Sequence, residues 1–101
     1  MDSKEALQRE LENHLRVGNA ALERGEHHRA LEEFRKIVER DPGNAVGHNK
    51  IGVVLAGLGR LDEAEKSFEE AIRLAPDIPQ PHTNLGNIYY CLLYTSDAAD
   101  E

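Results

Sequence analysis

The sequence predicts an all-α fold of stacked helix hairpins, and two observations carry this prediction. The first is a 34-residue period, which is typical of stacked helical-repeat proteins. Structurally demanding residues recur at this step: His14, His48 and His82; Gly18, Gly52 and Gly86; Gly25 and Gly59; Ala30 and Ala64; Phe34 and Phe68; and Pro42 and Pro76. The second is the apolar spacing within each period, which falls at steps of three and four, as on one face of an α-helix.

The first period predicts two helices, over residues 4–24 and 28–40. Gly25 stops the first helix, because glycine accepts the left-handed conformation of a helix C-terminus. Pro42 follows the second, where its missing N–H and fixed φ prevent continuation. Each unit is therefore a helix, a tight turn, a second helix and a proline turn.

The second period repeats this pattern, and a third begins it. We expect helices over 45–58, 61–74 and 79–92. The small residues explain how the paired helices approach each other, since a larger side chain would hold them apart. These positions are Gly18, Gly52, Ala30 and Ala64.

Composition narrows the classes of partner. Apolar residues make up 40% of the chain, which favours a folded domain over disorder. The formal charge of -7 argues against nucleic-acid binding and against anionic membrane surfaces. The N-terminus lacks the apolar core of a secretion signal, and no stretch has the ~20 apolar residues of a membrane span. We therefore expect a cytoplasmic protein without nucleic-acid or membrane partners.

These residues resemble the tetratricopeptide repeat family, whose unit is a helical hairpin with fixed large, small and proline positions. Repeat 2 matches at Ile51, Gly52, Leu55, Ala64, Phe68, Ala71 and Pro76. The departures are Ile37 at a small position and histidine in the usual tryptophan slot. The resemblance covers about residues 11–90 and implies a right-handed α-solenoid of about 2.5 repeats.

The resemblance also divides the chain. An N-terminal helical extension spans residues 1–10, repeat 1 spans 11–44 and repeat 2 spans 45–78. The first helix of a truncated repeat 3 occupies 79–90, so we expect a fragment of a longer array in which Leu85, Ile88 and Tyr89 are partly uncovered. From Cys91 the sequence reads CLLYTSDAADE, which resembles a translated transposase sequencing adapter. We therefore expect residues 91–101 to be a non-native tail.

The family lines the concave face of its solenoid with residues of the first helix of each repeat. The residues expected to form a peptide-binding groove here are Leu15, Asn19, Asn49, Lys50, Val53, Thr83, Asn84 and Asn87. Asparagine carries both a donor and an acceptor, so spaced asparagines can hold an extended peptide backbone. Some members clamp acidic chaperone tails, and Asn19 matches one clamp position. Leu15, Lys50, Gln80 and Asn84 do not match the others, so chaperone-tail binding is not expected.

Metal-binding and catalytic arrangements have little support. Equivalent helices lie at least ~8–10 Å apart, so His14, His48 and His82 cannot converge on one ion. His27 and His28 are sequence neighbours and do not share a helix face. No glycine-rich phosphate loop follows a strand, and no serine lies in a turn that would expose a nucleophile. We expect no metal, no cofactor and no enzymatic activity in this segment.

The sequence thus favours a scaffold that presents a groove to an extended peptide or a partner helix. One alternative is a targeting arm of a larger enzyme, such as a glycosyltransferase, whose catalytic domain lies outside this chain. The segment His82 to Gly86 is similar to the repeats that precede O-linked N-acetylglucosamine transferase domains, but Arg16 and Lys50 interrupt the asparagine ladder that would strengthen this similarity. Another is self-association through the uncovered C-terminal helix.

Overall fold

The structure, a computed structural model, describes residues 3–99, with side chains described as far as Leu93. Five helices make up this part of the chain: α1 (Ser3–Glu23), α2 (His27–Arg40), α3 (Ala45–Gly57), α4 (Leu61–Leu74) and α5 (Pro79–Ala99). Residues 3–99 contain no strand, and none of their helices is both long and apolar enough to cross a bilayer.

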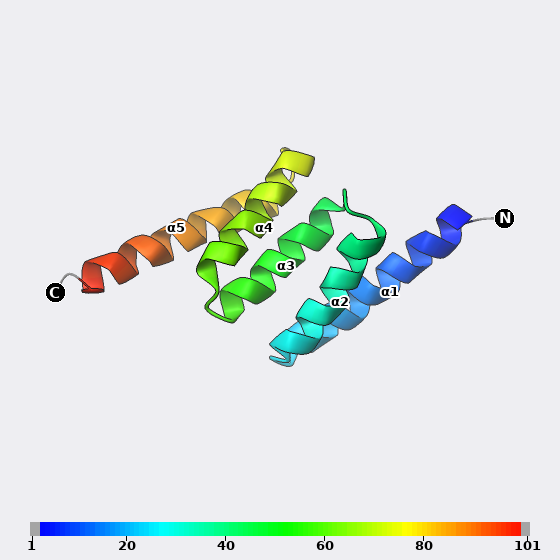
Figure 1. Cartoon of the computed structure of the whole chain (residues 1–101), viewed down its shortest axis with the longest axis horizontal. Coiled ribbons are helices and arrows are strands. Elements are labelled where there is room, and N and C mark those ends of the chain that lie inside the picture. The colour runs from blue at the N-terminus through cyan, green and yellow to red at the C-terminus, as the bar shows by residue number, and fades with distance from the viewer. Residues whose placement is uncertain (1–2, 100–101) are drawn as a thin grey trace.

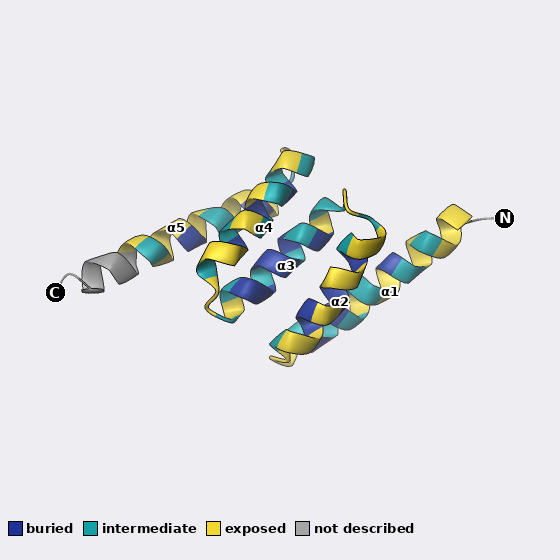
Figure 2. Cartoon of the chain, viewed as in Figure 1, coloured by how far each residue is buried: buried dark blue, intermediate teal, exposed yellow. Residues whose placement is uncertain are grey.

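The helices stack in chain order along an elongated molecule of 62 × 29 × 18 Å (Figure 1). Each helix packs on the next, and α3 also contacts α5. The first helices of the hairpins, α1, α3 and α5, thus line one side of the stack, and α2 and α4 line the other. This arrangement leaves α3 as the most enclosed helix (Figure 2).

The ends of α1 and α3 share one turn geometry. Gly25 and Gly59 have φ values of 76° and 80°, the left-handed region that favours glycine. The backbone N–H of Glu26 donates to the Ala21 carbonyl at 2.8 Å, and that of Arg60 donates to Leu55 at 2.9 Å. These are the long hydrogen bonds of a Schellman motif. The prediction that the two glycines end the first helices is confirmed.

The proline turns between hairpins are also equivalent. His48 Nε2 lies 3.0 Å from the carbonyl oxygen of Pro42, and His82 Nε2 lies 2.8 Å from that of Pro76. Each imidazole thus joins the start of a first helix to the preceding turn. The two rings make separate contacts, which explains their 34-residue spacing without a shared ligand.

A glycine–phenylalanine contact joins the two helices of each complete hairpin. A Cβ added at Gly18 would lie 2.5 Å from the Phe34 ring, and one at Gly52 would lie 2.5 Å from the Phe68 ring. Both rings are buried, at 0% and 1% exposed. Since neither glycine site has room for a methyl group, the small residues do permit the close helix pairing expected from the sequence.

Helix α5 differs from the expectation in two ways. It continues to Ala99 rather than ending near residue 92, because Leu93 replaces the glycine that ends α1 and α3, and no proline follows. Ile88 is only 3% exposed, so its expected partial exposure is wrong: it packs toward α3 and α4. Tyr89 is 49% exposed, as expected.

The adapter-like segment 91–101 enters the last turns of α5. Residues 100–101 lie outside the described part of the chain. Its non-native origin stays a prediction that the nucleotide sequence would test.

Candidate peptide-binding surface

A hollow of about 200 Å³ lies between α3, α4 and α5. We call it the inner hollow, and its lining residues are Val53, Ala56, Leu61, Phe68, Asn84, Asn87, Ile88 and Cys91. Its surface is mostly apolar, and the polar groups come from Asn84 and Asn87. Three residues predicted from the sequence, Val53, Asn84 and Asn87, therefore meet in one hollow.

A hydrogen bond between the first helices of repeats 2 and 3 borders this hollow. Asn84 Nδ2 donates to Asn49 Oδ1 at 3.0 Å. Asn49 is 9% exposed, whereas Asn84 is half-buried. The predicted groove residue Asn49 thus serves to hold Asn84 in place, and Asn84 keeps its own oxygen for another donor.

The other predicted groove residues lie along α1 and α3. Leu15 and Asn19 line a second hollow of about 420 Å³ on α1, together with Glu12, Arg16, Ala20 and Glu23. Leu15 also lines a third hollow, of about 200 Å³. The other apolar residues that line this third hollow are Leu11, Ile37 and Val46. Lys50 and Thr83 line none of these three hollows. Sequence reasoning missed the α4 residues Leu61 and Phe68 in the inner hollow.

One buried polar atom on α1 lacks a partner. The side-chain oxygen of Asn19 is buried and accepts no hydrogen bond from any residue of the described chain. Leaving such an acceptor unpaired costs about 1–3 kcal/mol. Rotation of the amide exchanges its oxygen and nitrogen, so Asn19 can offer the second hollow either group.

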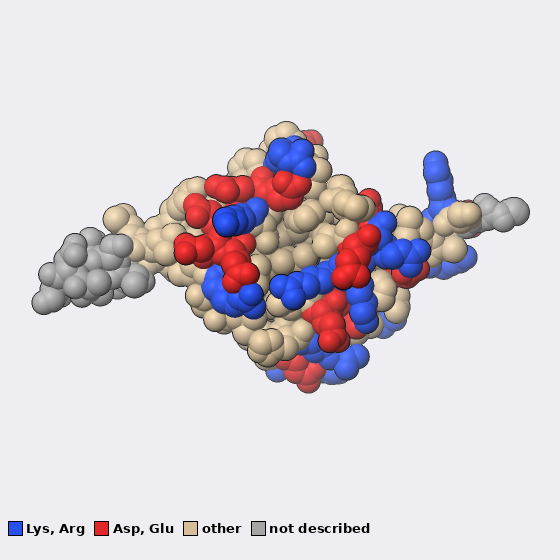
Figure 3. Space-filling model, viewed as in Figure 1, with Lys and Arg blue, Asp and Glu red and all other residues tan. Residues whose placement is uncertain are grey.

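The opposite side of the stack carries charges of both signs. Figure 3 shows Lys and Arg intermingled with Asp and Glu over α2 and α4. Arg60 pairs with Glu63, and Arg73 pairs with Glu70, one helical turn apart in each case. These exposed pairs contribute little to stability and present no single-sign patch.

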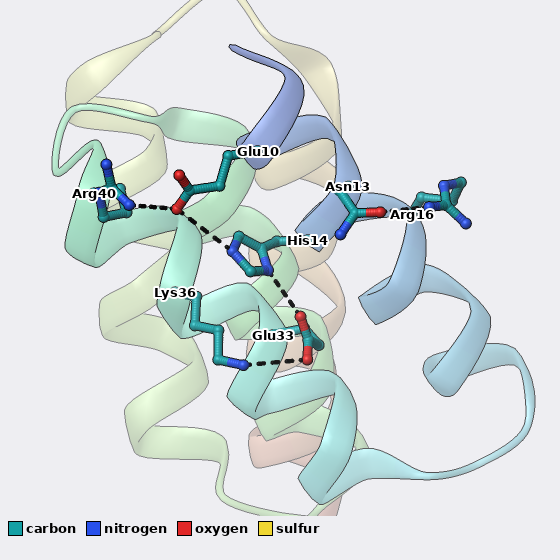
Figure 4. Close-up of polar contacts among 7 residues, drawn as sticks. All are labelled: Glu10, Asn13, His14, Arg16, Glu33, Lys36 and Arg40. Carbon is teal, nitrogen blue, oxygen red and sulfur yellow. Dashed lines mark hydrogen bonds and ion pairs between the residues drawn. The ribbon is translucent and has the colours of Figure 1, made fainter. Parts of the chain in front are cut away.

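A partly exposed polar network, with Glu33 as its buried member, joins α1 to α2 (Figure 4). His14 Nδ1 donates to Glu33 Oε1 at 2.9 Å, and Lys36 Nζ lies 3.4 Å from Glu33 Oε2. On the other side of the ring, Glu10 lies 3.7 Å from His14 Nε2 and also pairs with Arg40. No sequence pattern indicated this network, because Glu33 follows another glutamate on a helix rich in charge.

The network lowers the pKa of the Glu33 carboxyl below its ordinary value of 4.5. The hydrogen bond from His14 is the main cause, and Lys36 contributes further, whereas burial acts in the opposite direction. The ionised carboxylate is therefore favoured in the folded state.

Acid should remove this contribution to stability. Because the folded pKa is lower than the unfolded one, Glu33 stabilises the fold fully above pH 4.5 and progressively less as the pH falls below it. We expect the free energy of unfolding to fall less steeply over that range in Glu33→Gln than in the parent chain. Urea titrations at several pH values between neutral and acid measure both slopes. Equal slopes would show that Glu33 titrates alike in both states.

The repeated helix hairpins define the chain as a helical-repeat protein. The chain belongs to the tetratricopeptide repeat family, which matches residues 2–45 and 15–79.

Curated relatives are similar over part of their length. The chain is 34% identical over 74 residues to the inactive TPR repeat-containing thioredoxin TTL3 of Arabidopsis thaliana. The match covers 73% of this chain and 11% of that protein, so the chain spans about a tenth of this relative.

Solved structures share the fold. The TPR2B domain of yeast Sti1, in complex with an Hsp70 peptide, superposes with a TM-score of 0.82 at 17% identity, over 91% of this chain and 74% of that one. The second TPR of Spaghetti (RPAP3), bound to an HSP90 peptide, gives 0.79 at 22% identity, over 95% and 91%. At these identities the likeness establishes the arrangement of helices alone.

Proposed function

We propose that the surface formed by α1, α3 and α5 binds an extended peptide or a partner helix, and that the chain acts as a non-catalytic scaffold. The observation that carries this proposal is the inner hollow, where an apolar floor meets two amide side chains. Apolar clefts with a few placed polar groups are the usual form of a binding site.

The chemistry of the inner hollow suits one peptide side chain and its neighbouring backbone. Val53, Ala56 and Ile88 offer apolar contact to a side chain of moderate size. Asn87 is exposed at the rim, and Asn84 is oriented by Asn49. Amides that donate and accept can bond a peptide backbone whatever its sequence, so the apolar contact supplies the selectivity.

The hollow on α1 extends this surface toward the N-terminal repeat. Leu15 provides an apolar contact there, and the Asn19 amide provides an unpaired polar group. An incoming peptide N–H could satisfy this acceptor after the amide rotates. The proposed surface therefore spans both repeats.

Relatives support binding of peptides in general. The Sti1 and Spaghetti domains were solved with chaperone peptides bound. Of the family's clamp positions for acidic tails, only Asn19 is matched here, whereas Leu15, Lys50, Gln80 and Asn84 depart. We therefore propose a partner other than an acidic chaperone tail.

A charge placed in the inner hollow tests the proposal. Peptides would be selected against the purified chain from a random displayed library, and the affinity of one synthetic peptide would be measured by calorimetry. We expect Val53→Arg to weaken binding at least about tenfold, because the new cation would occupy the apolar floor of a central contact.

Ser67→Arg is the matched control. Ser67 is half-buried, as Val53 is, and the substitution adds the same charge, but it lies on α4 and does not line the hollow. Binding to this variant should match that of the parent chain, and circular dichroism would verify that both variants fold. Equal losses in the two variants, or no selectable peptide, would contradict the proposal.

A second candidate is a targeting arm within a larger protein. The relative TTL3 favours this candidate. The match covers only 11% of the length of TTL3, and the name of that protein combines TPR repeats with a thioredoxin. This relative supports attachment to another domain and does not single out a glycosyltransferase. The uninterrupted gene would discriminate between the scaffold and the targeting arm, since a targeting arm requires a non-repeat domain in the same protein. For both candidates we propose a cytoplasmic location.

A further inference from the structure

The third hollow, between α1, the end of α2 and the start of α3, is lined by acidic side chains and by no basic one. Glu12 and Asp41 both line it, and its other lining residues are uncharged. Glu12 is exposed and Asp41 is half-buried. The equivalent residues of repeat 2 are Val46 and Ala75, so the pair of acids is specific to the N-terminal end of the proposed surface.

Neither carboxylate of this hollow forms an ion pair with another residue of the described chain. The Gln8 amide donates to Glu12 Oε1 at 3.3 Å, and the Asn44 amide donates to Asp41 Oδ2 at 3.2 Å. Both donors are uncharged, and no further partner of either carboxylate is present among the described residues. Because an ionised carboxylate has about four acceptor positions, each keeps most of them for a charged donor.

The basic residues nearest in sequence do not compensate this charge. Arg16 donates to Asn13, and Arg40 pairs with Glu10 (Figure 4). Arg9, one turn before the first acid of the hollow, forms no ion pair with either carboxylate. Two negative charges therefore face the third hollow without a cation of the described chain bound to them.

The second hollow supplies an independent sign that donors are missing at this end of the surface. It adjoins the third hollow, since Glu12 and Leu15 line both. Its buried Asn19 side-chain oxygen accepts no hydrogen bond within the described chain, and Glu23 adds a further carboxylate. A ligand that carries several N–H donors would satisfy acceptors in both hollows.

We propose that the third hollow binds a lysine or arginine side chain of the peptide. Such side chains combine an aliphatic stem with a cationic head, and the stem packs on apolar surface. The four apolar residues of the hollow would contact the stem, and Glu12 and Asp41 would accept charge-assisted hydrogen bonds from the head. This inference rests on the proposed function and adds the charge of the partner. All the residues involved precede the adapter-like segment.

Helix α3 sets the spacing between the basic residue and the apolar residue of the peptide. Val46 lines the third hollow and Val53 lines the inner hollow. They lie two helical turns apart on one face of α3, a rise of about 10 Å. Since an extended peptide advances about 3.3 Å per residue, the two peptide side chains should be about three residues apart.

Selection from a random displayed peptide library tests the composition of the partner. Among peptides whose binding Val53→Arg weakens, we expect lysine and arginine to be enriched over the unselected library, about three residues from an apolar residue. Selected peptides without this enrichment, or with acidic residues at that position, would overturn the inference while peptide binding itself stands. Failure to select any peptide would instead contradict the proposed function, and this inference with it.

Glu12→Gln/Asp41→Asn and Glu32→Gln/Glu39→Gln form a matched pair of variants. Each removes two carboxylates with little change of shape, but Glu32 and Glu39 are exposed on α2 and line none of the three hollows. The probes are a selected peptide with lysine at the basic position and its analogue with norleucine there, which keeps the stem and removes the charge. Calorimetry would measure all affinities.

The parent chain and the Glu32→Gln/Glu39→Gln control should bind the norleucine analogue at least about tenfold more weakly than the lysine peptide. In Glu12→Gln/Asp41→Asn the two peptides should bind within about threefold of each other, because the charge that recognises lysine is gone. A lysine preference that survives in this variant, or that disappears equally in the control, would place the recognition outside the third hollow and overturn the inference.

Discussion

Replacing Phe68 with alanine should lower the free energy of unfolding by about 3–5 kcal/mol, the cost of removing a large buried side chain. Phe68 is 1% exposed and lies against Gly52, so its ring is enclosed where α3 and α4 meet. Small domains are stable by about 5–15 kcal/mol, and this single loss would therefore leave the second hairpin marginal.

Urea unfolding monitored by circular dichroism measures this cost. Tyr90→Ala is the control, since it removes an aromatic ring that is 67% exposed. It should cost less than about 1 kcal/mol. Similar costs for the two variants would mean that Phe68 is not enclosed between the helices.

Substituting leucine for Gly52 should destabilise the chain by about 1–3 kcal/mol through overpacking. The first added carbon would already lie 2.5 Å from the Phe68 ring, and that ring is buried and cannot move aside. The helices of the second hairpin must therefore separate. Thermal and urea unfolding would both register the change.

Gly86→Leu is the same substitution at the equivalent repeat position. It should be neutral or stabilising by up to about 1 kcal/mol, because the site is open and leucine favours a helix over glycine. Opposite signs at two positions related by the 34-residue period would locate the close helix contact at Gly52. Equal effects at both sites would contradict the pairing of α3 with α4.

The helices were predictable from a few residues whose physical demands are local or periodic. Gly25 and Gly59 must take positive φ values, and the prolines stop α2 and α4, so the ends of α1 to α4 were predicted to within one residue. The end of α5 was predicted too early because the stop was inferred from the family's repeat length. At Leu93 no residue breaks the helix.

The candidate site was less predictable, because it depends on contacts between repeats. The period places Asn49 and Asn84 at different positions of their repeats, 35 residues apart, and only the stacking of α3 on α5 brings their amides together. The inner hollow also includes Leu61 and Phe68 from α4, which a list restricted to the first helices omits. The His14–Glu33 bond likewise depends on which faces of α1 and α2 meet.

The central claim is that a glycine of each complete hairpin's first helix packs against a phenylalanine ring of the following helix. Nuclear Overhauser contacts between the glycine α-protons and the phenylalanine ring protons test it directly. We expect strong cross-peaks for Gly18 with Phe34 and for Gly52 with Phe68, because a Cβ at either glycine would lie 2.5 Å from the nearest ring carbon. A dilute, isotope-labelled sample in which both glycines lack ring contacts while the helices persist would contradict this account of the fold.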